Sequence, residues 1–136
     1  MHILVTGAFG WTAQAILQAL YVAGHTITAF DLPDAPQHDG VARYATEIIT
    51  GSVADGPVVM AAMSDVDAVV HLAVAIGSDA YQSAVIPFAT NVHGTYNVFA
   101  AALQNGVQKV ILMSEAAVHV THPGTEPVKA TDSLCT

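Results

Sequence analysis

The stretch His2-Ile3-Leu4-Val5-Thr6-Gly7-Ala8-Phe9-Gly10-Trp11-Thr12-Ala13 begins as a short apolar run, turns through two glycines and continues as a helical pattern. Gly7 can adopt backbone angles that other residues avoid, and Gly10 lacks the Cβ atom that would keep the main chain away from a pyrophosphate. Ala13 is small enough for the helix to pack closely on the strand. The unpaired N–H groups of the first helical turn would then face the phosphates. We therefore predict a strand, a turn and a helix that together cradle phosphate groups.

The next predicted strand ends in an acidic residue. The helical pattern runs to Ala23 and stops at Gly24, and residues 26–30 are β-branched and apolar. Asp31 follows, 24 residues after Gly7. An acidic side chain there accepts hydrogen bonds from the adenosine ribose hydroxyls of a dinucleotide, and its charge repels a 2′-phosphate. Asp31 therefore favours NAD over NADP, the alternative being an ordinary solvated loop aspartate.

Strand and helix patterns alternate through the rest of the chain. Residues 32–40 have no periodicity and are predicted to form a surface loop. Further strands are predicted at residues 45–50, 67–73 and 109–113, and helices near residues 58–63 and over residues 85–103, the latter stopping at Asn105 and Gly106. Right-handed crossovers would join these elements into an α/β fold of the Rossmann type, a doubly wound parallel sheet of about five strands in the order 3-2-1-4-5.

Length, composition and charge limit the class of protein. The 136 residues are 53% hydrophobic, enough for one domain with a sizeable core. No stretch approaches the ~18 consecutive apolar residues of a membrane span, and no leader pattern precedes the first strand, so we expect a cytoplasmic location. The formal net charge of −8 argues against nucleic acid or an anionic membrane as a partner.

Four segments together resemble the NAD-dependent epimerase/dehydratase family, the extended short-chain dehydrogenase/reductases. The segments are residues 6–13 (TGAFGWTA), similar to T-G-x-x-G-x-x-G; Asp31, similar to the ribose-binding acid; residues 67–73 (DAVVHLA), similar to D-x-V-x-H-x-A; and residues 91–98 (NVHGTYNV), similar to N-V-x-G-T-x-N-V. They span nearly the whole chain, and their combination is more specific than any one of them.

The resemblance implies NAD as the cofactor and a set of contacts to it. These contacts are Gly7, Gly10, Trp11 and Thr12 at the pyrophosphate turn, Asp31 at the ribose, Ser52 and Val53 at the adenine, Leu72, Ala73 and Val74 on the ribose and nicotinamide side, and Asn91. Two of the residues leave a question open. Trp11 could shield the pyrophosphate or cover the start of the helix, and Ser52 stands where the family has an aspartate, which would weaken a contact to the adenine amino group.

The catalytic residues of the family are replaced or missing. Residues 114–119 are similar to S-[ST]-x-x-V-Y, which places Glu115 where the family has its catalytic serine or threonine. None of the four tyrosines is followed four residues later by a lysine, so the family's Tyr-x-x-x-Lys pair has no counterpart here. We therefore expect residues 1–115 to form the dinucleotide-binding domain, truncated before a sixth strand. Residues 116–136 are expected to be an irregular segment that leads toward a missing catalytic and substrate region.

Two classes of function remain open. The first is the NAD-binding part of an epimerase/dehydratase or dehydrogenase that transfers hydride on a sugar, a sugar nucleotide or a related hydroxyl or ketone substrate. The second is a non-catalytic dinucleotide-binding or sensor protein of the same fold, which Glu115 and the missing Tyr/Lys pair favour. The chain itself is expected to bind dinucleotide weakly and to be inactive.

Three further expectations concern side chains outside the cofactor motifs. The long helix with Phe88, Tyr96 and Phe99 is expected to form a homodimer, because family members often dimerise through such helices. Glu115, His119 and His122 could ligate a metal ion, but their spacing is loose and we predict loop residues and no metal site. His71 lies inside an apolar strand and is predicted to be a hydrogen-bonded core residue.

Overall fold

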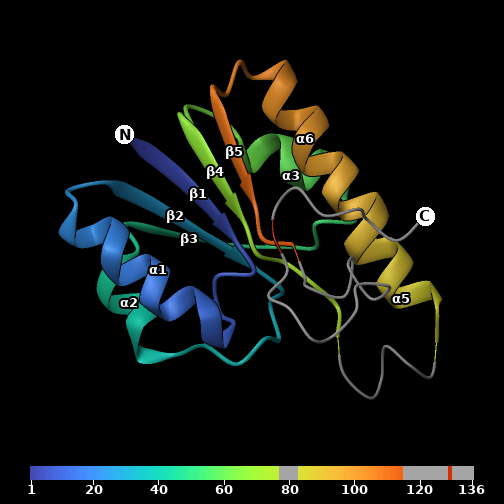
Figure 1. Cartoon of the computed structure of the whole chain (residues 1–136), viewed down its shortest axis with the longest axis horizontal. Coiled ribbons are helices and arrows are strands. Elements are labelled where there is room, and N and C mark those ends of the chain that lie inside the picture. The colour runs from blue at the N-terminus through green and yellow to red at the C-terminus, as the bar shows by residue number, and fades with distance from the viewer. Residues whose placement is uncertain (77–82, 115–128, 130–136) are drawn as a thin grey trace.

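A computed structural model describes residues 1–76, 83–114 and 129 of the chain (Figure 1). Its strands are β1 (His2–Thr6), β2 (Thr26–Asp31), β3 (Glu47–Thr50), β4 (Ala68–His71) and β5 (Lys109–Leu112). Its helices are α1 (Trp11–Val22), α2 (Asp39–Tyr44), α3 (Gly56–Ala62), α5 (Val85–Pro87), the π-helical segment η1 (Phe88–Gly94) and α6 (Thr95–Gln104). The predicted alternation of strands and helices is therefore confirmed.

The five strands form one parallel sheet in the order β3-β2-β1-β4-β5, as predicted. The register places the carboxyl ends of the central strands level, because Thr6 of β1 pairs with Phe30 of β2 and with His71 of β4. The chain winds outward from β1 in both directions, so the switch point of the topology lies between β1 and β4. Open α/β sheets bind their ligands at this point, beyond the carboxyl ends of the strands.

Helix α2 corrects the prediction for residues 32–40. The helix begins at Asp39, so the surface loop ends at His38 rather than at Gly40. Its six residues are too few for a periodic apolar pattern, and Val41 alone supplies a fully buried apolar side chain, 1% exposed. A helix this short is held by its packing against α1 rather than by its own propensity.

The helix over residues 85–104 also differs from the prediction. It was expected to be α-helical throughout, whereas residues 88–94 are π-helical. At the end of this part, Thr95, the first residue of α6, donates a 2.8 Å hydrogen bond from its Oγ1 to the Asn91 carbonyl, and such side-chain bonds compete with the backbone ladder. The helix ends as predicted, with Asn105 as its cap and Gly106 at a φ of +70°.

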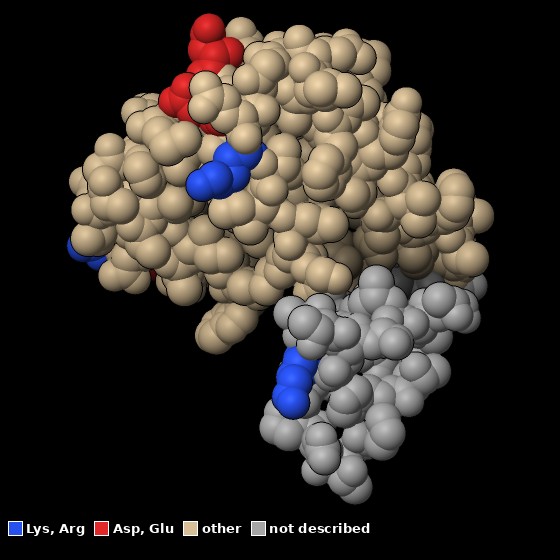
Figure 2. All heavy atoms as spheres, turned by 45° about the horizontal axis from the view of Figure 1, so that its top comes forward, with Lys and Arg blue, Asp and Glu red and all other residues tan. Residues whose placement is uncertain are grey.

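No charged residue occurs between positions 85 and 104, and the described surface in Figure 2 carries few charged side chains. In the part of the chain that the structure describes, no helix has the length and apolar character needed to cross a membrane.

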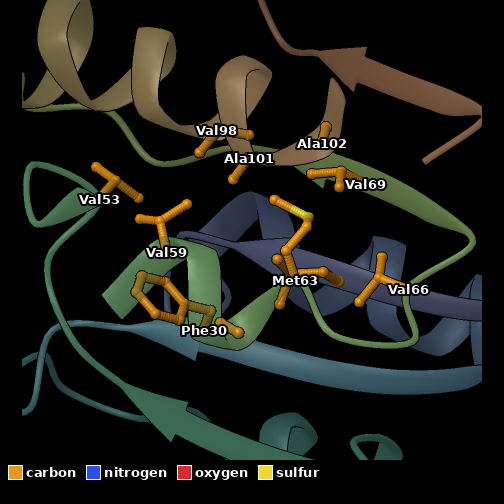
Figure 3. Close-up of a cluster of buried hydrophobic side chains, with 11 residues drawn as sticks. Phe30, Val53, Val59, Met63, Val66, Val69, Val98, Ala101 and Ala102 are labelled. Carbon is orange, nitrogen blue, oxygen red and sulfur yellow. The ribbon is translucent and has the colours of Figure 1, made fainter. Parts of the chain in front are cut away.

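The two faces of the sheet bury separate cores because side chains alternate along each strand. Helices α3 and α6 cover one side of the sheet, and α1 and α2 cover the other (Figure 1). In β1, Leu4 packs in the core on the first side, while Ile3 and Val5 pack in the core on the second. Met63 and Val98 pack with Phe30 in the first core, and both are 0% exposed (Figure 3). These layers leave the carboxyl edge of the sheet open to a ligand.

Candidate functional site

The turn between β1 and α1 requires glycine at its first position for two reasons. Gly7 has a φ of +68°, a conformation that residues with a side chain rarely adopt. A Cβ atom there would also lie 2.6 Å from the backbone N of Ala73, so the turn and the segment directly after β4 approach each other too closely for any side chain. Gly10 keeps an ordinary φ of −71° as the residue before α1. Ala13 is 1% exposed, which confirms the predicted close packing of the helix on the sheet.

The start of α1 is suited to an anion. Gly10 is the N-cap residue and offers no side chain to bond the first N–H groups of the helix. The first turn contains no acidic residue. The first N–H groups of a helix have no partner within the helix, and the helix dipole places roughly half a positive charge at that end. Trp11 and Thr12, the first two residues of α1, therefore present their backbone amides where the sequence predicts a pyrophosphate.

Asp31 lies at the carboxyl end of β2 and connects to the turn. One carboxylate oxygen accepts a 2.8 Å hydrogen bond from Phe9 N–H, and the other accepts a 2.8 Å bond from Leu32 N–H. Each carboxylate oxygen has a further lone pair for another donor, such as a ribose hydroxyl. The sequence analysis did not foresee the bond to Phe9, because it depends on the register of two neighbouring strands.

A cleft of about 480 Å³ opens along the carboxyl edge of the sheet. Ten of the eleven residues predicted to contact the cofactor line it, namely Gly7, Gly10, Trp11, Thr12, Asp31, Ser52, Val53, Leu72, Ala73 and Val74. Sequence reasoning missed one wall of the cleft, formed by the segment before α2 with Leu32, Ala35, Pro36 and His38. That segment has no motif, and the prediction of a surface loop left its side chains without a role.

The end of the cleft at which the sequence predicts the adenine is shaped by contacts with η1 and α6. Val53 is 5% exposed, and its carbonyl accepts a 3.0 Å hydrogen bond from the Asn97 side chain. A Cβ on Gly94 would lie 2.5 Å from a Val53 methyl group, so the helix packs directly on this loop. The Ser52 hydroxyl accepts a 3.2 Å bond from Ala54 N–H. This local turn holds Ser52 at the cleft wall.

Asn91 is the one predicted cofactor residue that does not line the cleft. Its Oδ1 accepts a 2.7 Å hydrogen bond from Ala75 N–H, and its Nδ2 donates a 3.1 Å bond to the Ala75 carbonyl. Both backbone groups of Ala75 are thus held by one side chain, directly after Val74 at the cleft wall. In the described structure Asn91 fixes the backbone beyond β4.

His71 confirms the prediction of a hydrogen-bonded core residue. Thr95 Oγ1 donates its hydrogen to the Asn91 carbonyl, so it accepts the 3.1 Å bond from His71 Nε2–H. His71 Nδ1 then accepts the 2.6 Å bond from Thr6 Oγ1–H, and Thr6 Oγ1 accepts from Ala73 N–H at 3.4 Å. The imidazole is 1% exposed, and this burial lowers its pKa from 6.5 to about 4. A neutral imidazole therefore connects β1, β4 and the long helix.

The residues at the predicted catalytic end fall outside the described part of the chain. Glu115, His119 and His122 are among them, so their positions relative to the cleft are not part of the structure. Among the residues that are described, no group of three or more His, Cys, Asp or Glu side chains is placed to share a metal ion.

Comparison with known proteins identifies the relatives of this chain. It is 36% identical over 135 residues to 2-alkyl-3-oxoalkanoate reductase of Stenotrophomonas maltophilia, a match that covers 95% of this chain and 37% of the relative. Among solved structures, a UDP-glucose 4-epimerase of Stenotrophomonas maltophila with bound NAD superposes with a TM-score of 0.87 at 26% identity, over 99% of this chain and 43% of the epimerase. A short-chain dehydrogenase/reductase superfamily protein of Agrobacterium tumefaciens with bound NAD superposes with a TM-score of 0.80 at 30% identity, over 99% of this chain and 39% of that protein.

The fold and its cleft define a Rossmann-like α/β domain of the extended short-chain dehydrogenase/reductase class. Within this class, the chain belongs to the 3-beta hydroxysteroid dehydrogenase/isomerase family, which it matches over residues 4–134. This confirms the resemblance to the NAD-dependent epimerase/dehydratases for their N-terminal portion. The chain spans 37% of the length of the reductase relative, so the activity of a whole family member is not carried over to it directly.

Proposed function

We propose that the chain binds NAD in the cleft at the carboxyl edge of the sheet. The observation that carries this proposal is the pairing of an uncapped helix start at Gly10 with the carboxylate of Asp31 in one cleft. The helix start suits the pyrophosphate, and Asp31 suits the ribose hydroxyls and disfavours a 2′-phosphate. The bound NAD named for two similar structures supports the same cofactor.

The reaction class that we propose is hydride transfer on a hydroxyl or ketone substrate, by a protein that contains this domain. NAD, when bound, would accept the hydride that leaves the carbon bearing the substrate hydroxyl. The chain's own residues hold the cofactor: Asn91 and the hydrogen bonds of His71 fix the backbone next to Ala73 and Val74. The reductase relative, named for a 3-oxoalkanoate, and the epimerase, named for a sugar nucleotide, leave a ketone, a sugar and a sugar nucleotide as substrate classes.

A non-catalytic dinucleotide-binding or sensor protein of the same fold is the second candidate. Glu115 at the position of the family's serine or threonine favours it. Both candidates require NAD binding. Calorimetric titration of the 136-residue chain with NAD is therefore the first test, and no detectable binding at millimolar NAD would contradict both.

The partner that we propose is a second copy of the chain, packed on the helix over residues 85–104. Apolar side chains recur along it at helical spacing and are exposed: Val85 74%, Phe88 64%, Val92 54%, Tyr96 68%, Phe99 43% and Leu103 83%. A contiguous apolar stripe of this kind, on a helix without charged residues, is typical of protein interfaces.

A further inference from the structure

Basic side chains are scarce in the described lining of the cleft. Among the described residues that line it there is no Lys or Arg, and His38 is the single basic residue. A dinucleotide brings two phosphate charges, whereas the start of α1 offers only roughly half a positive charge. Asp31 adds a negative charge to the same cleft. Further positive charge in the cleft would therefore strengthen the binding of a pyrophosphate.

His38 lines the same cleft as the start of α1 and contacts the side chain of Trp11 there. It is the residue directly before α2, it is half-buried, and its ring meets the Trp11 ring edge to face, with 6.3 Å between the ring centroids and 79° between the planes. Trp11 is the first residue of α1 and is 82% exposed. The contact between the two rings brings the imidazole from the loop to the end of the cleft where α1 begins.

We propose that protonated His38 binds the pyrophosphate of the dinucleotide, with its ring positioned by Trp11. This inference rests on the proposed NAD binding. A protonated imidazole has two N–H donors, and its hydrogen bonds to phosphate oxygens are charge-assisted. Histidine is the side chain that ordinarily changes its charge between about pH 5 and pH 8. Affinity for ligands that carry the pyrophosphate therefore rises as the pH falls through this range.

The charged side chains around His38 are mostly negative. In the described structure, the charged residues on the elements around it are Asp31, Asp34, Asp39 and Arg43, and α1 has none. Arg43 lies at the far end of α2, over the ring of Tyr44 at 5.5 Å. Because the carboxylates outnumber the arginine, a phosphate at this end of the cleft meets net negative charge, and protonation of His38 makes that charge less negative.

Binding at two pH values tests the proposal directly. We expect the 136-residue chain to bind NAD and ADP about tenfold more tightly at about pH 6 than at about pH 8, which corresponds to one hydrogen bond to a charged group. We expect the affinity for adenosine, which lacks the pyrophosphate, to be the same at both pH values. His38→Gln removes the gain, whereas the control His25→Gln keeps it, because His25 precedes β2 at the opposite edge of the sheet.

Adenosine 2′-monophosphate separates the two phosphate positions. If lowering the pH tightened the binding of this nucleotide but not that of ADP, the assignment of His38 to the pyrophosphate would be overturned. NAD affinity that is equal at both pH values, or a gain that His38→Gln retains, would contradict the role of His38 while leaving NAD binding intact. No binding of NAD at either pH would contradict the proposed function itself.

Fluorescence reports the ring contact independently of any ligand. Trp11 is the only tryptophan, and a protonated imidazole in contact with an indole quenches its emission. We expect the emission of the unmodified chain to fall as the pH decreases from about 8 to about 5, and that of His38→Gln to stay constant. Emission that falls equally in both proteins would contradict the pairing of Trp11 with His38.

Discussion

The carboxylate of Asp31 accepts a 2.8 Å hydrogen bond from the backbone N–H of Phe9, so the end of β2 is joined directly to the glycine turn. The same carboxylate faces the cleft in which the ribose is proposed to bind. Asp31 therefore has a structural role and a proposed binding role at once. A substitution that removes the side chain would affect both, and the choice of variant decides which of the two is measured.

Asp31→Asn separates the two roles. The amide oxygen can still accept the Phe9 N–H, but the amide NH2 cannot accept the Leu32 N–H, and the negative charge that disfavours a 2′-phosphate is lost. We expect NAD to bind about tenfold more weakly, and the preference for NAD over NADP to narrow, because a hydrogen bond to a charged group is replaced by one to a neutral group. Calorimetric titrations with both cofactors measure this. Tighter binding of NADP than of NAD with Asp31 intact would show that the ribose assignment is wrong.

Gly7→Ala tests the close approach of the glycine turn to the backbone that directly follows β4. The new Cβ would lie 2.6 Å from Ala73 N in addition to the strain of the positive φ. Gly24 has a φ of +78°, and a Cβ added there would meet no atom within 4 Å, so Gly24→Ala carries the strain without the overlap. We expect Gly7→Ala to lower the free energy of unfolding by about 2 kcal/mol more than Gly24→Ala does. Equal losses in denaturant titrations would contradict the overlap.

The sequence predicted most of the fold because each βα unit carries its own local signal. The glycine turn, the apolar strands and the stop at Asn105 and Gly106 depend on neighbouring residues only, and all three were located correctly. Helix α2 was missed because six residues with one fully buried apolar side chain give no period to detect. The π-helical segment was missed because its apolar positions also fit an α-helix.

The site was predicted as a set of residues but not as a network. Motifs located Asp31 and Asn91, yet the bonds of Asp31 to Phe9 and of Asn91 to Ala75 join residues 22 and 16 positions apart. Such contacts follow from strand register and helix packing, which a single sequence does not encode locally. The wall that contains His38 has no motif at all, so only the folded chain places it beside Trp11.

The lowered pKa of His71 predicts that the free energy of unfolding falls in acid. Its folded-state pKa is lowered to about 4 from 6.5, so the unfolded chain binds a proton that the folded chain excludes. The stabilising effect is complete above pH 6.5 and is lost as the pH falls from 6.5 toward 4. At 1.36 kcal/mol per pKa unit, the loss between pH 7 and pH 4 is about 3 kcal/mol.

His71→Gln isolates this contribution from that of the carboxylates. The glutamine does not titrate, so the variant is less stable than the unmodified chain at pH 7 but loses about 3 kcal/mol less on acidification to pH 4. Denaturant titrations across this range give both curves. If the free energy of unfolding changed with pH in the same way in the two proteins, the pKa of His71 would not be lowered in the folded chain.

Leu103→Glu tests the proposed dimer. The leucine is 83% exposed on the stripe of α6, and a glutamate there would place two like charges in a two-fold interface. Val22→Glu is the matched control, because Val22 is 78% exposed at the end of α1, outside that stripe. We expect light scattering to give a dimer for the unmodified chain and for Val22→Glu, and a monomer for Leu103→Glu. A monomeric unmodified chain at high concentration would rule out the proposed partner.

The last prediction is that the 136-residue chain binds NAD but catalyses no hydride transfer. Transfer on a hydroxyl or ketone substrate requires a general acid–base within hydrogen-bond reach of the reacting oxygen, with a pKa near the working pH. The four tyrosines and two lysines of the chain contain no Tyr-x-x-x-Lys pair. Glu115 offers a carboxylate at the position of the family's serine or threonine, and a glutamate ordinarily titrates near ~4.3, too low to serve as an acid at neutral pH.

Absorbance of the reduced nicotinamide measures the outcome. We expect no change in absorbance when the chain is incubated with NAD and a panel of sugars, sugar nucleotides and hydroxyalkanoates, nor with reduced cofactor and the matching ketones. Calorimetric binding of NAD to the same preparation is the control that the cofactor site is formed. Glu115→Gln provides the decisive comparison, because it removes the carboxylate while keeping the size of the side chain. Turnover by the unmodified chain that disappears in Glu115→Gln would overturn the prediction and make Glu115 the catalytic acid–base, whereas turnover that survives the substitution would assign the reaction to another residue of the chain.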